Sequence, residues 1–279
     1  MLNENPLSRR HFLQTTSAAA SVAALTHSIS ARAYAVEAKD GWIELFDGKT
    51  LKGWHKNPTR IGHGTGGTWQ VEDGTITGEQ DPPGSGNGGI LLTDQKFGDF
   101  ELQLDIKPDW GVCSGLFLRA NDRGQCIQMM VDYHDAGNVG HLYGEGTGGW
   151  NTRTFDVNGK YEGDQKLVAL TSANPKTVAA AGLISSCSAE DWLKSWKLND
   201  WNAVKVVATG KYPKITTWIN GLQVCEFDGD KSNVERYKKD DVLSSLTATG
   251  SIAVQVHGGK GWPNGAKCRW KNIRVRPLT

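Results

Sequence analysis

The sequence predicts an all-β domain, a sandwich or jelly roll, and three observations support this prediction. Many short segments alternate between apolar and polar residues, as half-buried strands do. Helical periodicity is almost absent, and the 34 glycines cluster between the alternating segments, where tight turns need them. Asn220-Gly221 lies between two of these segments and is the strongest hairpin signal in the chain, typical of a type I′ turn.

The expected strands cover most of the chain after residue 42. In the clearest one, residues 99–107, every second residue from Phe100 to Ile106 is apolar. Two regions interrupt the pattern: residues 140–151, expected to be a Gly-rich loop, and residues 161–200, expected to be an insertion with a weakly helical patch at residues 188–197. The expected strands comprise residues 43–46, 68–71, 74–77, 89–93, 99–107, 114–120, 126–134, 201–209, 214–219, 222–228, 251–257 and 267–276.

Residues 1–35 are expected to be a signal peptide of the twin-arginine type. Arg9-Arg10 precede a mild apolar run at residues 15–29, and Ala33-Tyr34-Ala35 offers a cleavage site with small residues. The run is short and rich in Ala, Ser and Thr, so membrane insertion is not expected. The expected partner before maturation is therefore the twin-arginine (Tat) export machinery, and the expected location is the periplasm or the extracellular space.

Removal of residues 1–35 leaves 244 of the 279 residues, enough for one large β domain with a well-buried core. Residues 36–40 are expected to be a short linker and residues 41–279 the domain. The removed segment holds three of the 31 basic and one of the 30 acidic residues, so the remaining net charge is −1. This near-neutral balance argues against nucleic acid or an anionic membrane as a partner.

The five cysteines have none of the close spacings that bind structural zinc. Cys126, Cys225 and Cys268 lie in expected strands, where a small buried thiol is the usual state. The chain also has no G-x-S-x-G motif and no recognisable Cys-His context. Hydrolysis through a nucleophilic serine or cysteine therefore has little support.

Three of the expected strands carry polar side chains on the face opposite their apolar one. At residues 251–257, Gln255 and His257 share such a face, and glycines follow directly. A histidine placed in this way can take or give a proton near neutral pH, although a solvent-facing histidine beside a turn is the alternative. If the three strands are neighbours, their polar side chains converge on a concave face that suits carbohydrate hydroxyl groups: Arg119, Gln128, Asp132, His134, Gln255 and His257.

The 11 tryptophans are the strongest compositional hint of carbohydrate binding, because indole faces stack on sugar rings. Most of them lie in or beside expected strands and are expected in the core. Trp150 and Trp262 lie in loops flanked by Gly or Pro, so they are the expected sugar platform. The Gly-rich loop at residues 140–151 supplies three further candidate site residues, His141, Tyr143 and Glu145.

A divalent metal ion is a further hypothesis for this set of residues. Asp132 and His134, together with His141 and Glu145, could supply oxygen and imidazole ligands. Short D-x-H pairs are common by chance, so no residue is assigned as a metal ligand.

A series of segments matches the pattern of a known family. It begins with Gly-Trp-Ile-Glu-Leu-Phe-Asp-Gly-Lys-Thr-Leu-Lys-Gly-Trp at residues 41–54 and continues over nearly all of the remaining chain, at residues 69–74, 97–102, 114–119, 142–144, 200–202, 218–221, 255–258 and 270–274. On these motifs the chain resembles the 3-keto-disaccharide hydrolase domains. The resemblance implies a concanavalin A-like jelly roll.

The resemblance also implies cleavage of 3-keto-glycosides, in which the sugar is oxidised at C3. A C3 ketone acidifies the proton on C2, so the bond from C1 to the leaving group can break by elimination, with water added afterwards. In this chemistry His257 would be the base or acid and Arg119 would clamp the enolate or a hydroxyl group. Gln128 and Gln255 would orient the sugar.

One departure from the family pattern concerns Cys126, which stands where a Glu-x-Gln motif usually has its Glu. Asp132 or Glu145 is then the substitute if the reaction needs that carboxylate. The insertion at residues 161–200 is a second departure and could reshape the choice of substrate. The alternative function is a non-catalytic carbohydrate-binding module that uses the same groove, and a third is a scaffold domain in a surface glycan complex.

Overall fold

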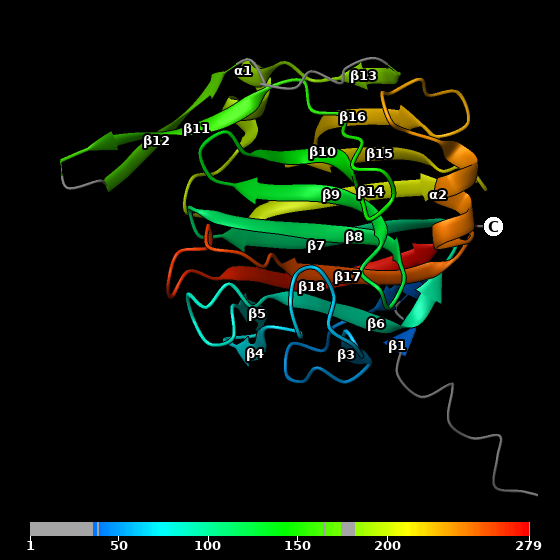
Figure 1. The fold of residues 1–279 in the computed structure, drawn as a ribbon, viewed down its shortest axis with the longest axis horizontal. Helices are drawn as coiled ribbons and strands as arrows, with labels where there is room; N and C mark the ends of the chain where they lie inside the picture. Colours follow the sequence, from blue (N-terminus) through cyan, green and yellow to red (C-terminus); the bar gives the residue numbers. More distant parts are fainter. Residues whose placement is uncertain (1–35, 38, 164–165, 174–181, 279) are drawn as a thin grey trace, which may run out of the picture. The chain divides into compact units, whose positions relative to one another are not determined.

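The computed structural model describes residues 36–37, 39–163, 166–173 and 182–278. The expected signal peptide, residues 1–35, lies outside the described residues. The described residues form two stacked antiparallel sheets, as Figure 1 shows. This architecture confirms the all-β, concanavalin A-like jelly-roll sandwich.

The first sheet has six strands in the order β10-β9-β8-β17-β6-β3 and carries the candidate site. Because β9, β8 and β17 are neighbours in it, the three strands with polar outer faces do lie side by side. Its strands are β3 (Trp54–Lys56), β6 (Gly89–Phe97), β8 (Val112–Ala120), β9 (Cys126–Tyr133), β10 (Asn138–Glu145) and β17 (Gly250–Val256).

The second sheet, called the large sheet from here on, has the order β1-β2-β18-β7-β14-β15-β16-β13, with β5 joined to β18 and β4 joined to β5. A separate hairpin consists of β11 (Asp156–Glu162) and β12 (Lys166–Ala173). The strands of the large sheet are β1 (Val36–Glu37), β2 (Ile43–Glu44), β4 (Thr68–Glu72), β5 (Thr75–Glu79), β7 (Phe100–Pro108), β13 (Leu183–Ser186), β14 (Asn202–Thr209), β15 (Lys214–Ile219), β16 (Leu222–Asp228) and β18 (Cys268–Pro277).

The main hydrophobic core lies between the two sheets. In β7, Phe100, Leu102 and Leu104 are buried, and the polar residues between them point outward. Burying each such side chain contributes about 1.5–3 kcal/mol. On the other side of the core, Leu116 and Met129 of the six-stranded sheet belong to the same cluster. The polar residues of both sheets are therefore left on their outer faces.

Two local predictions are confirmed by the backbone. Asn220 and Gly221 have φ values of 50° and 87° between β15 and β16, as a type I′ turn requires. The patch expected to be helical contains α1 (Ala189–Ser195), capped by the Ser188 side chain, which accepts a hydrogen bond from the Asp191 amide.

The predicted Gly-rich loop at residues 140–151 is wrong in its first half, because β10 continues to Glu145 and pairs with β9. A register shift between Val139 and Leu142, with Gly140 at a φ of 106°, breaks the alternation that would have marked a strand. The structure also places β1 in the segment expected to be a linker, since Val36 pairs with Glu44.

A second helix, α2 (Lys239–Leu246), was not expected from the sequence. Its signals are weak: Asp240 and Asp241 in the first turn, and Val242 and Leu246 buried four residues apart. A short 3-10 helix also occupies Lys39–Gly41. Within the described ranges, no helix has the length and apolar character needed to cross a membrane.

Candidate active site

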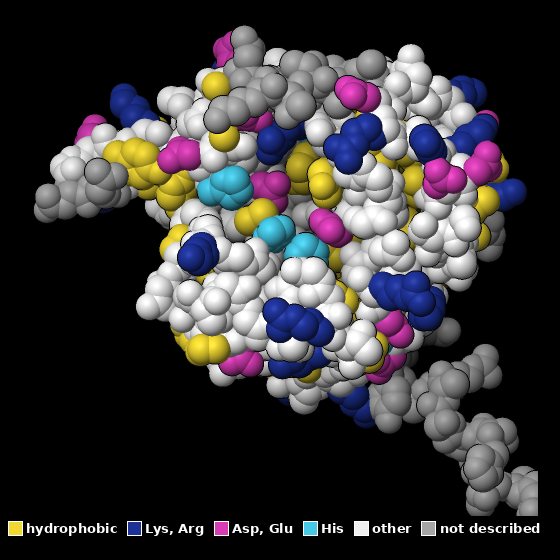
Figure 2. Space-filling view, viewed as in Figure 1, with side chains coloured by type: hydrophobic (Ala, Val, Ile, Leu, Met, Phe, Trp, Pro, Cys, Tyr) yellow, Lys and Arg dark blue, Asp and Glu magenta, His cyan; other side chains and the backbone are white. Residues whose placement is uncertain are grey.

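The candidate site lies on the outer face of the six-stranded sheet. Figure 2 shows histidine and acidic side chains gathered around a hollow on this face. The hollow is a cavity of 340 Å³ at the ends of β8, β9 and β17. Its lining includes Trp110, Cys113, His134, His257 and Trp262.

His257 lines this cavity and lies beside a second imidazole ring, that of His63. The ring centroids of His63 and His257 are 4.8 Å apart and their planes meet at 63°. The His63 Nε2 atom is 3.5 Å from Oε1 of Glu145, and the His257 Nδ1 atom bonds to the carbonyl oxygen of Gly258. Because a carbonyl oxygen only accepts hydrogen bonds, neutral His257 carries its proton on Nδ1 and exposes a lone pair on Nε2.

His63 reaches the sheet from the loop between β3 and β4. Its carbonyl oxygen accepts a hydrogen bond from the Gly88 amide at 2.7 Å. The backbone of His63 also packs directly on Gly258, where an added Cβ would lie 2.2 Å from the same carbonyl oxygen. Only glycine at residue 258 therefore lets the loop approach closely enough to place His63 beside His257.

Beneath His63, two buried amides form a hydrogen-bonded chain. Gln128 Nε2 donates to Gln255 Oε1 at 3.2 Å and to the Ser114 carbonyl oxygen at 3.1 Å. Gln255 Nε2 in turn lies 3.1 Å from Nε2 of His63. Because Gln128 and Gln255 are both buried, their amides orient His63, rather than reaching a sugar as the sequence suggested.

Glu145 lies directly across from Cys126 in the β9–β10 pair. Its carboxylate therefore projects from the same face as the Cys126 thiol, one strand further along the sheet. Glu145 therefore provides a carboxylate on the strand next to Cys126, the residue that stands where the family motif has its Glu. Tyr143 lies on the same face of β10, where burial and the charge of Glu145 raise the pKa of its hydroxyl group.

A second acidic group, Asp132, lies next to Cys113 and His134, which line the cavity. The Cys113 thiol donates to Asp132 Oδ1 at 3.2 Å. Burial raises the pKa of Asp132, while the charges of His134, Arg153 and His257 act in the opposite direction. Burial and the charge of Asp132 raise the pKa of the Cys113 thiol well above its usual value, so Cys113 remains protonated and is a poor nucleophile.

The aromatic wall of the cavity is formed by Trp110 and Trp262. Trp262 lines the cavity although it is almost fully buried, and its indole N–H donates to the Ala266 carbonyl oxygen. Trp110 is half-buried and donates its indole N–H to the Tyr161 hydroxyl group at 2.6 Å. Tyr161 donates to Asp135 Oδ2. The β11–β12 hairpin thus supports the rim of the cavity.

The structure does not bring Arg119 to this site. Its guanidinium is buried and bonds to Asp99 Oδ1 at 2.9 Å and to the carbonyl oxygens of Gly98 and Gly210. The prediction placed Arg119 on the polar face by simple alternation. A register shift between β8 and β17, with a φ of 52° at Arg119, turns the side chain away instead.

His141 is also placed elsewhere, in contrast to its prediction as a site residue. It is fully buried, and its ring bonds to Asn138 Oδ1 and to the Ser186 hydroxyl group. Burial lowers its pKa to about 3. His141 is therefore a neutral core histidine that joins β10 to β13.

Trp150 is likewise a core residue rather than a sugar platform. It is 1% exposed and stacks on Phe227 with a centroid distance of 5.0 Å, while Tyr237 meets its edge. The glycines that precede it in the sequence do not determine its burial, because a loop can fold its indole inward.

Four site residues were missed by the sequence analysis: His63, Cys113, Trp110 and Arg153. The density of glycines around His63 is a signal of close backbone approach, but it does not reveal the partner. Arg153 is the guanidinium whose charge acts on Asp132, and its Nε is buried without a hydrogen-bond partner among the described residues.

The expected metal ligands are only partly brought together. Asp132 and His134 lie close, and with Cys113 their donor atoms are within 4.8 Å of one another. His141 and Glu145 bond elsewhere. Cys113, Asp132 and His134 are therefore the part of a candidate ligand set that lies together among the described residues, with Cys113 in place of the expected His141 and Glu145.

Comparison with protein families gives one match over nearly the whole described domain. The model of the 3-keto-alpha-glucoside-1,2-lyase-like domain matches residues 41–276. A Bacteroides thetaiotaomicron protein named 3-keto-disaccharide hydrolase is 37% identical over 89 residues, which make up 30% of this chain. The matched part is 29% of that relative's length.

Solved structures resemble the chain more distantly. A Parabacteroides distasonis protein provisionally described as a glycosyl hydrolase is 18% identical, with a TM-score of 0.49 over 86% of this chain and 94% of that one. The β-glucanase of Bacillus licheniformis is 12% identical, with a TM-score of 0.41 over 85% of this chain and 97% of that one.

Proposed function

The chain belongs to the 3-keto-alpha-glucoside-1,2-lyase-like domain family, and from this premise we propose that it cleaves glycosides oxidised at C3 of the sugar. The observation that carries the proposal is the pair of adjacent imidazoles, His63 and His257, at a cavity on the outer face of the six-stranded sheet. Elimination next to a ketone needs a base and an acid close together, and two histidines can serve as both near neutral pH.

The reaction balances without an external oxidant or reductant. The base removes the C2 proton, and the electron pair of that bond forms the enolate of the C3 ketone. The enolate then collapses to a C1–C2 double bond while the C1–O bond breaks, and an acid protonates the leaving oxygen. Water adds its oxygen to C1 of the resulting enone and C2 regains a proton, which completes a net hydrolysis.

We assign the base to His257. Its Nδ1 proton is held by the Gly258 carbonyl oxygen, so Nε2 is free to accept the C2 proton. His63 is then the acid for the leaving oxygen. Gln255 Nε2 donates to Nε2 of His63 at 3.1 Å and fixes the ring, so the proton that neutral His63 can give lies on Nδ1. Glu145 Oε1 lies 3.5 Å from the same Nε2 atom.

The charge on the enolate oxygen needs a positive group or hydrogen-bond donors. Arg119 was expected to fill this role, but its guanidinium is held by internal partners. We assign the electrostatic role to Arg153, whose charge acts on Asp132 and whose guanidinium is held near it by Asp156 at 3.5 Å and by the Ala136 carbonyl oxygen. Trp110 and Trp262 line the cavity and supply apolar surface for a sugar ring.

The proposal is tested with a panel of 3-keto-disaccharides of both anomeric linkages, beside their unoxidised parents, with products identified by mass analysis. Wild type should cleave the oxidised sugars only. His257→Ala and His63→Ala should each lower kcat by about 10²-fold or more. His55→Ala is the matched control, because His55 lies on edge strand β3 and bonds to Asp94.

Two outcomes contradict the proposal. Cleavage of unoxidised sugars at the same rate removes the need for a ketone. Sugar binding without cleavage of any member of the panel supports the non-catalytic carbohydrate-binding module instead.

The site of action is a further part of the proposal. The Arg9-Arg10 pair and the apolar run behind it support export by the twin-arginine route, which places the reaction in the periplasm or outside the cell. In that location the expected substrates are glycans or fragments of them.

A further inference from the structure

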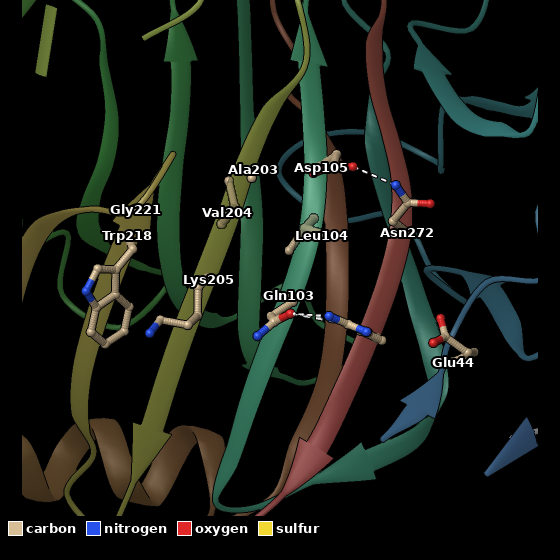
Figure 3. A pocket seen from close by; sticks show the side chains of 11 residues that line it. Glu44, Gln103, Leu104, Asp105, Ala203, Val204, Lys205, Trp218, Gly221 and Asn272 are labelled. Carbon is tan, nitrogen blue, oxygen red and sulfur yellow. Dashed lines mark hydrogen bonds between the residues drawn. The ribbon is translucent and has the colours of Figure 1, made fainter. Parts of the chain in front are cut away.

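A second cavity lies on the outer face of the large sheet, on the far side of the core from His257. It is a groove of 680 Å³, twice the volume of the cavity at the candidate site. This volume is within the range of ligand sites in general, about 300–1,000 Å³. Figure 3 shows its side chains projecting from neighbouring strands of the sheet.

The groove follows one row of side chains across five strands. Lys205 pairs with Trp218 on one side and with Gln103 on the other, and Gln103 pairs with Arg274. Glu44 continues the row, since it pairs with Arg274. Four strand spacings span about 19 Å, enough for several sugar rings in a chain.

Two β-bulges aim side chains into this groove. The register between β18 and β7 shifts between Lys271 and Arg274, where Asn272 has a φ of 53° and adds an outward amide. The register between β15 and β16 shifts next to Trp218. Bulges of this kind re-aim side chains beside binding sites, and both of these lie at the edges of the same groove.

The floor of the groove is kept low by a small residue. Ala203 is exposed and pairs with Asp105 of β7, two residues before Lys205, which pairs with Trp218. Trp218 lines one side of the groove, and the Lys205 ammonium lies over one face of its indole, 3.9 Å from the ring centroid. The rest of the indole and the ammonium together offer apolar surface and a hydrogen-bond donor to a sugar ring.

The groove has equal numbers of positive and negative side chains, and this balance favours a neutral ligand over a charged one. Lys205 and Arg274 contribute two positive groups, and Glu44 and Asp105 contribute two negative ones. A charged ligand would meet a like charge within the row, whereas neutral hydroxyl groups find both donors and acceptors there. Asn272 donates to Asp105 and Gln103 accepts from Arg274, so these amides hold the charged side chains in place and leave the Asn272 carbonyl oxygen as a further acceptor.

The geometry points to a second carbohydrate-binding surface, which takes a neutral oligosaccharide chain across the outer face of the large sheet. It goes beyond the proposed catalytic function and is independent of it. This surface holds a glycan at one face of the sandwich while the site on the six-stranded sheet acts on a sugar at the other.

The test uses the full domain and isothermal titration with cellohexaose, laminarihexaose, maltohexaose and the charged hexagalacturonate. Wild type should bind at least one of the neutral hexaoses. Trp218→Ala should raise the Kd about tenfold, and Ala203→Arg, which fills the groove without removing any packing, should abolish binding. Turnover of a 3-keto-disaccharide should be unchanged in both variants.

Two matched controls locate the binding. Trp201→Ala removes another half-buried tryptophan of the chain, capped by Lys271 at 4.0 Å but outside the groove, and should leave the Kd unchanged. His257→Ala should also leave it unchanged. The inference is overturned if no neutral hexaose binds, if hexagalacturonate binds more tightly, or if Ala203→Arg binds like wild type. Loss of binding in His257→Ala would place the sugar at the candidate active site instead.

Discussion

Gly258→Ala provides a sharp test of how the histidine pair is positioned. An ideal Cβ at residue 258 would lie 2.2 Å from the carbonyl oxygen of His63 and 2.8 Å from its carbonyl carbon. Ordinary contact begins at 3.4 Å, so the His63 loop has to move away by about 1 Å. A displacement of this size at a catalytic group can lower the rate by about 10²-fold.

The matched control is Gly261→Ala. Gly261 lines the same cavity, but an added Cβ would meet no atom within 4 Å. Neither Gly258 nor Gly261 has a positive φ, so alanine fits the backbone at both positions. We expect kcat on a 3-keto-disaccharide to fall only in Gly258→Ala, with circular dichroism spectra alike in the two variants. Equal turnover by both variants would refute the role of this close contact.

Three further predictions follow from individual residues. Burial lowers the pKa of His141 from 6.5 to about 3. Between these two pH values His141 is protonated in the unfolded chain and neutral in the folded one, so the free energy of unfolding decreases as pH falls below 6.5. Urea unfolding should show wild type losing about 2 kcal/mol relative to His141→Gln between pH 7 and pH 5; parallel pH profiles would contradict this. Tyr161→Phe should raise KM about fivefold with little change in kcat, because Trp110 loses its hydrogen-bond acceptor; an unchanged KM would separate the hairpin from the site. Replacing Arg9 and Arg10 by Lys should retain the protein in the cytoplasm, as cell fractionation would reveal, since the signal is read as a guanidinium pair; normal export would remove the twin-arginine assignment.

The fold was predictable wherever one face of a strand is buried and the other is not. In β7 the sequence shows apolar and polar residues alternating from Phe100 to Ile106, because the core lies on one side of the strand only. Asn220-Gly221 was equally clear, since few other pairs tolerate two positive φ values. In β10 the bulge near Gly140 breaks the period, so the same reasoning missed the strand.

The candidate site was predictable in residues that lie in or directly after regular strands, and in one loop residue, Trp262, which lines the cavity as expected. Gln128, Asp132 and Gln255 share one face because β8, β9 and β17 are neighbours. His63 could not be predicted from the sequence, because it lies in an irregular loop and contacts Gln255, 192 positions away. Arg119 was misplaced because simple alternation does not anticipate a bulge.

Local composition also misled the assignment of the aromatic residues. Trp150 lies among glycines, yet it fills the core between Phe227 and Tyr237. Trp110 has no distinguishing neighbours in the sequence, yet it lines the cavity with Trp262. Burial is a property of the whole packing arrangement, and a flanking Gly or Pro does not determine it.

The central claim, removal of the C2 proton by the histidine pair, is tested most directly by cleavage of a 3-keto-disaccharide in D2O. Elimination followed by hydration predicts that the released 3-keto sugar carries one deuterium at C2, faster than in a control with heat-inactivated enzyme, and that His257→Ala suppresses this incorporation together with cleavage. Cleavage by wild type at full rate without deuterium at C2 would contradict the account, because it would mean that water attacks C1 directly.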